Sequence, residues 1–86
     1  MNLRQLEHLM ALAEEGSFSR AAERMHLTQS ALSRSLQGLE DELGARLIDR
    51  SGRRSTLTPL GEALLARAQR FVLEAAEIER SAELLR

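Results

Sequence analysis

The sequence predicts a mainly α-helical protein with three short helices, a small β-hairpin and one long C-terminal helix. Three observations lead to this prediction. Capping residues and glycines divide the first 44 residues into three helical segments. A Ser-Gly turn then separates two short segments that can pair as strands, and a Thr-Pro pair begins a helical pattern without a break.

The first two helices are marked by local signals. Asn2 is a good N-cap for the first helix, and Gly16 is a common kind of helix stop. Ser17 can then cap a second helix over residues 18–25. The apolar positions of the first helix follow helical spacing, and they are Leu3, Leu6, Leu9, Met10 and Ala13.

A turn of three residues, 26–28, joins the second helix to the third. His26 belongs to a residue type that is enriched in the left-handed region among non-glycines. Thr28 is a good N-cap for a helix from residue 29 to about 43, which Gly44 ends. Two helices joined by so short a turn are typical of a helix-turn-helix.

The third helix has two distinct faces. Its leucines fall within a narrow stripe that we expect to be buried: Leu32, Leu36, Leu39 and Leu43. The opposite face carries Ser30, Ser33, Arg34, Gln37, Gly38 and Asp41. The N-terminal half of that face has no acid, whereas Glu40, Asp41 and Glu42 crowd the C-terminal end. A recognition helix that enters the major groove by its N-terminal half would tolerate this arrangement, although an ordinary solvated face would look the same.

A hairpin follows around the turn Ser51-Gly52, with a wing predicted at about residues 47–57. Arg53 and Arg54 lie at or just past its tip. After a helix-turn-helix, a small basic hairpin is placed to reach phosphates or the minor groove, which we prefer to a simple solvated turn. The predicted fold is therefore a winged helix-turn-helix followed by a long helix.

The long helix begins at Thr58-Pro59 and is expected to run to Arg86. Its apolar residues recur in alternating steps of three and four, the coiled-coil spacing: Leu64, Ala68, Phe71, Ala75, Ile78, Ala82 and Leu85. The helix is roughly 40 Å long, longer than a domain of this size can cover. The distal stripe therefore predicts a homodimer, with residues 1–58 as the winged domain and 59–86 as the dimerisation helix.

Composition excludes several function classes. There are no cysteines, so neither disulfides nor thiolate metal sites are possible, and no apolar run approaches the length of a membrane span. His8 and His26 are isolated, so we expect no metal, no cofactor and no catalytic site. The net charge of −1 is unusual for a nucleic-acid binder, but residues 16–58 hold seven arginines against five acids. The charge distribution is therefore compatible with DNA binding but does not by itself predict it.

The ordered pattern resembles the N-terminal domain of LysR-type transcriptional regulators, over essentially the whole chain. The matching residues are Leu6, Leu9, Ser17-Phe18-Ser19-Arg20-Ala21-Ala22, Leu27-Thr28-Gln29-Ser30-Ala31-Leu32-Ser33-Arg34, Leu39-Glu40, Leu43-Gly44, Arg46-Leu47, Arg50, Leu57-Thr58 and Gly61. Ser30, Ser35 and Ile48 depart from the residues frequent in that family, namely proline, glutamine and phenylalanine.

The resemblance implies a bacterial, cytoplasmic, nucleoid-associated regulator that binds inverted-repeat operators in double-stranded DNA as a dimer through its long helix. It implies contacts from Gln29, Ser30, Ser33 and Arg34 in the major groove and from the wing arginines. Our full set of candidate DNA-binding residues is Ser17, Arg20, Thr28, Gln29, Ser30, Ser33, Arg34, Gln37, Arg50, Arg53 and Arg54. The family's C-terminal effector domain has no counterpart here, so we expect no small-molecule site within these residues.

Two other interpretations stay open at this point. The net negative charge would also suit a helical protein-interaction module that binds no DNA. Another winged-helix family with a different dimer would share the chemistry but hold the long helices apart.

Overall fold

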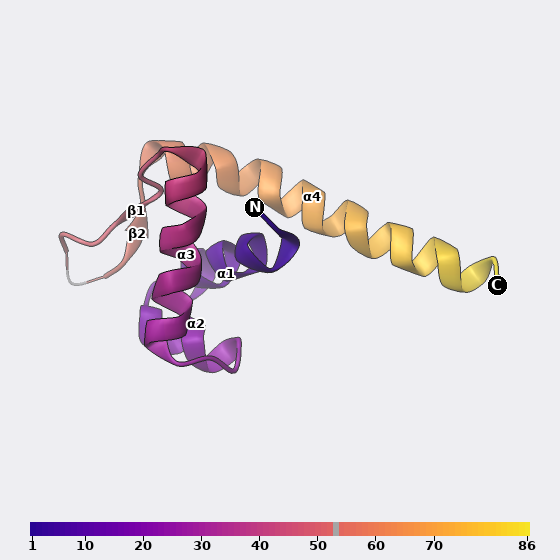
Figure 1. Ribbon diagram of the computed structural model, residues 1–86, viewed down its shortest axis with the longest axis horizontal. Helices are drawn as coiled ribbons and strands as arrows, with labels where there is room; N and C mark the ends of the chain where they lie inside the picture. Colours follow the sequence, from indigo (N-terminus) through magenta and orange to yellow (C-terminus); the bar gives the residue numbers. More distant parts are fainter. Residues whose placement is uncertain (53) are drawn as a thin grey trace.

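The computed structural model describes residues 1–52 and 54–86. It contains four helices and a two-stranded antiparallel sheet among these residues (Figure 1). The elements are α1 (Leu3–Glu15), α2 (Phe18–Arg24), α3 (Gln29–Leu43), β1 (Ile48–Asp49), β2 (Thr56–Leu57) and α4 (Pro59–Leu84). The predicted order is confirmed. The second helix ends one residue earlier than predicted and the fourth helix two residues earlier.

The helix starts follow the predicted caps. The side chains of Asn2, Ser17, Thr28 and Thr58 each accept a hydrogen bond from a backbone N–H in the first turn of their helix. Left-handed glycines end α1 and α3. His26, in the turn between α2 and α3, has a φ of +59°, so the left-handed residue of this turn is a histidine.

One core joins α1, α2, α3 and β1. Its fully buried large residues are Leu9, Leu12, Leu32, Leu36, Leu39, Leu47 and Ile48. Ala21 and Ala22 of α2 are also fully enclosed, and small side chains at this point let α2 lie close to its neighbours. The expectation that Leu43 is buried is wrong, because 40% of Leu43 is exposed. Leu43 is the last residue of α3, where the helix has passed the end of the core.

The strands of the wing are shorter than the segments predicted for them. Ile48 pairs with Leu57 and Asp49 with Thr56, and Leu47, Arg50, Arg54 and Ser55 lie outside the two strands. The hydroxyl and the backbone N–H of Ser51 donate to Asp49, which holds the pKa of that carboxyl below its usual value. The turn that follows β1 is therefore fixed by the side chain of Asp49.

Only the first part of α4 packs on the body, and the rest projects away from it (Figure 1). Gly61 and Ala68 are buried, whereas the residues after Val72 are exposed or at most half-buried. Thr58 anchors the start of α4, because its hydroxyl donates to the carbonyl of Arg46 at 2.7 Å and accepts from the N–H of Gly61 at 3.0 Å. The start of α4 is therefore fixed to the loop that precedes β1.

Candidate nucleic-acid interface

The N-terminal half of α3 presents the polar face that the sequence predicted. Gln29, Ser30 and Arg34 are exposed and Ser33 is half-buried. Beside them lies a hollow of about 370 Å³ between α3, the start of α2 and the wing, lined by Phe18, Gln29, Ser30, Ser33, Arg50 and Ser55. Four of the candidate residues thus meet at one surface. Phe18 and Ser55 were not among the candidates.

Two candidates, Ser17 and Thr28, use their side chains as helix caps. Their hydroxyl oxygens accept the N–H groups of Arg20 at 3.2 Å and Ala31 at 3.1 Å. Each hydroxyl keeps its own proton to donate, so each can still contact a phosphate oxygen. Arg20 is exposed on α2.

The C-terminal half of α3 differs from the N-terminal half. The Gln37 amide donates to the Asp41 carboxylate at 2.9 Å and is therefore engaged within the helix. Gly38 does not lie on the solvent face as the pattern suggested. A methyl group at position 38 would lie 3.4 Å from the side-chain nitrogen of Gln5, so this position faces α1.

Two of the wing arginines, Arg50 and Arg54, lie against the protein itself. The guanidinium of Arg50 lies 5.2 Å from the centre of the Phe18 ring, and its Nη1 lies 3.6 Å from the Glu40 carboxylate. Arg54 is exposed and folds back so that its guanidinium lies beside Gly16, at the end of α1. The predicted contact of Arg53 falls outside the described residues.

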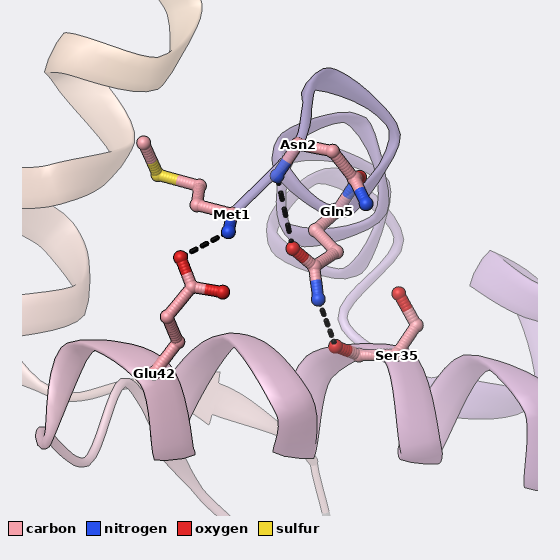
Figure 2. Close-up of polar contacts among 5 residues, drawn as sticks. All are labelled: Met1, Asn2, Gln5, Ser35 and Glu42. Atoms are coloured by element: carbon pink, nitrogen blue, oxygen red, sulfur yellow. Dashed lines mark hydrogen bonds and ion pairs between the residues drawn. The ribbon is translucent and has the colours of Figure 1, made fainter.

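Helix α1 holds α3 in place through polar contacts (Figure 2). The Gln5 amide donates to the backbone carbonyl of Ser35 at 3.2 Å while its oxygen accepts the N–H of Asn2 at 3.0 Å. The ammonium group of Met1 pairs with Glu42 near the end of α3. These contacts help to fix the orientation of the helix that carries the candidate DNA-binding residues.

His8 adds a buried contact between the same two helices. Its Nδ1 lies 2.6 Å from the Ser35 hydroxyl, and only 4% of the residue is exposed. Burial lowers the pKa of this imidazole, the charge of Arg4 lowers it further, and Glu7 raises it. The buried position therefore favours the neutral form of His8, which has a role in the core rather than at a site.

The seven predicted dimer residues divide into two groups. Leu64 and Ala68 pack on the chain's own core. Phe71, Ile78 and Leu85 are 57%, 63% and 86% exposed, and Ala75 and Ala82 lie between them. An apolar hollow of about 240 Å³ lies where α4 leaves the body, lined by Met1, Leu6, Leu9, Leu39, Leu43, Leu47, Leu64, Arg67, Ala68 and Phe71. The exposed stripe and the hollow meet at Phe71.

Glu40 is a further residue whose position differs from the prediction. The sequence groups it with the acids at the end of the polar face of α3, but only 5% of it is exposed. A signal was available, because a residue four positions after Leu36 lies only about 40° further around the helix. That places Glu40 at the edge of the leucine stripe.

Within the described part of the chain, no group of three or more histidine and acidic side chains could hold a metal ion. No helix in the same residues is long and apolar enough to cross a membrane.

A helix-turn-helix packed on a first helix and followed by a two-stranded wing defines the winged helix-turn-helix class of DNA-binding domains. The model of one such family, the bacterial regulatory helix-turn-helix proteins of the lysR family, matches residues 3–62. The chain belongs to this family of transcriptional regulators.

Known relatives agree with this assignment. The SDS degradation transcriptional activation protein of Pseudomonas sp. (strain ATCC 19151) is 54% identical over 71 residues, which are 83% of this chain and 23% of that protein. The chain thus spans less than a quarter of that relative's length.

Solved structures of similar domains carry DNA. The BenM_DBD complex with benA site 1 DNA is 33% identical with a TM-score of 0.95, and the match covers 99% of this chain and 96% of that one. The CbnR_DBD–DNA complex is 39% identical with a TM-score of 0.88, and the match covers all of both chains. The chain therefore has the fold of LysR-family DNA-binding domains, which belong to transcriptional regulators and not to enzymes.

Proposed function

We propose that this chain binds double-stranded DNA sequence-specifically as a homodimer, as the DNA-binding part of a bacterial LysR-type regulator. The observation that carries the proposal is the exposed, acid-free N-terminal half of α3 beside the wing. Two similar solved structures, of BenM_DBD and CbnR_DBD, are DNA complexes. A protein that binds operators in this way acts in the cytoplasm, on the nucleoid.

In this proposal α3 enters the major groove by its N-terminal half. Arg34 is exposed and makes no hydrogen bond or ion pair with another described residue, so its guanidinium is available for two hydrogen bonds to guanine. Gln29 suits adenine, and the hydroxyls of Ser30 and Ser33 suit bases or phosphates. The acidic end of α3 then points away from the phosphates.

Binding is tested by fluorescence anisotropy with labelled duplexes over a range of salt concentrations. Phosphate contacts predict that affinity falls linearly with salt on logarithmic axes. Arg34→Ala should weaken binding to a selected site by about 1–3 kcal/mol and bind random duplexes almost as before. The matched control is Arg24→Ala, because Arg24 is already paired with Glu14 at 2.6 Å and Glu15 at 3.3 Å.

An equal loss of affinity on all duplexes would make Arg34 a phosphate contact and not a base reader. Duplex binding that is absent at every salt concentration would contradict the proposal and favour a protein-interaction module.

The dimer is proposed to form through α4, because its exposed apolar stripe has no cover within the described chain. Charge favours an antiparallel pair. Residues 59–70 carry two arginines and one glutamate, whereas residues 71–86 carry four glutamates and two arginines. Antiparallel pairing sets the basic half of one helix against the acidic half of its partner. The division into a winged domain, 1–58, and a pairing helix, 59–86, belongs to the same proposal.

Sedimentation tests the dimer. Phe71→Asp should shift the protein toward monomer at micromolar concentration, because a buried unpaired carboxylate is costly. Leu73→Asp is the matched control. Leu73 is 70% exposed and lies on a different side of the same helix, about 160° around from Phe71. Equal effects of the two substitutions, or a monomeric parent protein, would contradict pairing through this stripe.

A further inference from the structure

The buried carboxylate of Glu40 connects the recognition helix α3 to the wing. Its Oε2 accepts the backbone N–H of Leu47 at 2.8 Å and that of Ile48 at 3.2 Å. Leu47 directly precedes β1 and Ile48 is its first residue, and we call these two N–H groups the β1 amides. A buried carboxylate is costly without partners, so this contact defines one preferred position of β1 against α3.

The second carboxylate oxygen extends the connection to Arg50. Arg50 follows the last residue of β1, and its Nη1 lies 3.6 Å from Glu40 Oε1. The same guanidinium lies over the Phe18 ring, at the N-terminus of α2. Glu40, Arg50 and Phe18 therefore join the wing to both helices of the helix-turn-helix, and we call these three residues the wing clamp.

The clamp borders the proposed DNA surface. Phe18 and Arg50 line the same hollow as Gln29, Ser30 and Ser33. Only 34% of the Arg50 side chain is exposed, and its charge already faces a carboxylate. Arg50 is thus placed to hold the wing beside α3 more than to meet a phosphate on its own.

We propose that Glu40 is a positioning residue for DNA binding, which acts through Arg50 and the β1 amides to fix the wing beside the recognition helix. The inference rests on the proposed function and deepens it. A wing held in place before binding does not lose its freedom when DNA arrives, whereas a loosened wing must be ordered at the expense of affinity.

The direction of the change in DNA affinity distinguishes a positioning role of Glu40 from a purely electrostatic effect of its charge. If charge alone matters, removing a negative charge from the C-terminal end of α3 should leave binding unchanged or strengthen it. Asp41→Asn removes such a charge from exposed Asp41, and its amide oxygen can still accept from Gln37. Glu40→Gln removes the neighbouring charge and keeps an oxygen for the β1 amides. Positioning predicts that Glu40→Gln weakens binding although Asp41→Asn does not.

The experiment measures duplex affinity over a range of salt concentrations for the parent protein, Glu40→Gln, Arg50→Gln, the double variant and Asp41→Asn. All measurements are made well below the midpoint of thermal unfolding of each variant. Amide hydrogen exchange at Leu47 and Ile48, without DNA, reports the wing directly.

We expect Glu40→Gln to bind duplexes about tenfold more weakly, with a shallower salt dependence. Its amide hydrogens at Leu47 and Ile48 should exchange faster than in the parent protein, whereas exchange in α1 should be unchanged. Arg50→Gln should match it, and the double variant should lose little more, because the two residues act as one unit. Affinity equal to or above the parent's in Glu40→Gln would overturn the proposal. A loss in Arg50→Gln alone would do the same and make Arg50 a direct phosphate contact.

Failure of the proposed function would look different. If the parent protein binds no duplex, that function is refuted. Amide hydrogen exchange alone then tests whether Glu40 holds the wing in place. Faster exchange at Leu47 and Ile48 in Glu40→Gln would then support the clamp, and unchanged exchange would overturn it.

Discussion

Replacing Gly38 by alanine should stabilise the protein. Glycine in a helix interior costs about 1 kcal/mol relative to alanine, because the unfolded chain is freer. The new methyl group would lie 3.4 Å from the nitrogen of the Gln5 amide, at the lower limit of ordinary contact. That amide is the end of a flexible side chain, so the cost of accommodating it is small. The expected gain is about 0.5–1 kcal/mol, or roughly 3–6 °C for a domain of this size.

Chemical unfolding followed by circular dichroism measures this change. Parent and variant are compared at equal protein concentration, because self-association adds to apparent stability. The midpoint should rise with an unchanged dependence on denaturant. Duplex affinity should be unchanged, since position 38 faces α1. A loss of stability would refute the helix argument and show that the bond from Gln5 to the Ser35 carbonyl cannot adjust. A more stable variant that loses DNA affinity would instead place Gly38 against DNA.

Two further substitutions test other contacts. Gly61→Ala should destabilise the protein by about 1–3 kcal/mol, because the added carbon would overlap the Leu47 carbonyl oxygen, and a neutral result in the same unfolding assay would contradict that packing. His8 gives a pH dependence: its folded pKa is lowered, so below about pH 6.5 the unfolded state binds the extra proton and stability falls until the folded pKa is passed. His8→Gln should flatten the pH dependence of stability over that range. If the free energy of unfolding changes equally with pH in the parent protein and in His8→Gln, His8 is not the cause of the pH dependence.

Local signals predicted most of the fold. The caps at Asn2, Ser17, Thr28 and Thr58 and the stops at Gly16 and Gly44 each depend on one residue and its own helix. Such signals are readable without tertiary structure. The strands were predicted too long, because the pairing of this small sheet depends on how the wing loop closes and not on residue preference alone.

Burial and contacts that depend on the tertiary structure could not be predicted from the spacing of residues along the sequence. Leu43 follows the leucine stripe and is still exposed, because the stripe continues to the end of the helix and the core does not. His8 is buried because it contacts Ser35, which lies 27 residues away in the chain. Glu40 is buried because it accepts hydrogen bonds from the β1 amides, which lie 7 and 8 residues away. Arg50 and Arg54 stay predicted DNA contacts, and the structure adds that each lies against the protein's own residues, which spacing alone does not predict.

Two kinds of evidence support the candidate DNA-binding residues, helix geometry and the family resemblance. The polar face of α3 follows from helix geometry, and the structure places Gln29, Ser30 and Ser33 at one surface with the wing. The assignment of individual contacts comes from the family resemblance, and it stays a prediction for every residue of the set.

The most direct test of a dimeric, sequence-specific reader is selection of bound duplexes from a random pool with the purified protein at moderate salt. We predict recovery of an inverted repeat whose half-sites lie about one helical turn apart. Recovery of no common sequence, by the parent protein and by a covalently joined dimer alike, would contradict sequence-specific reading. A single half-site without a repeat would contradict the dimer.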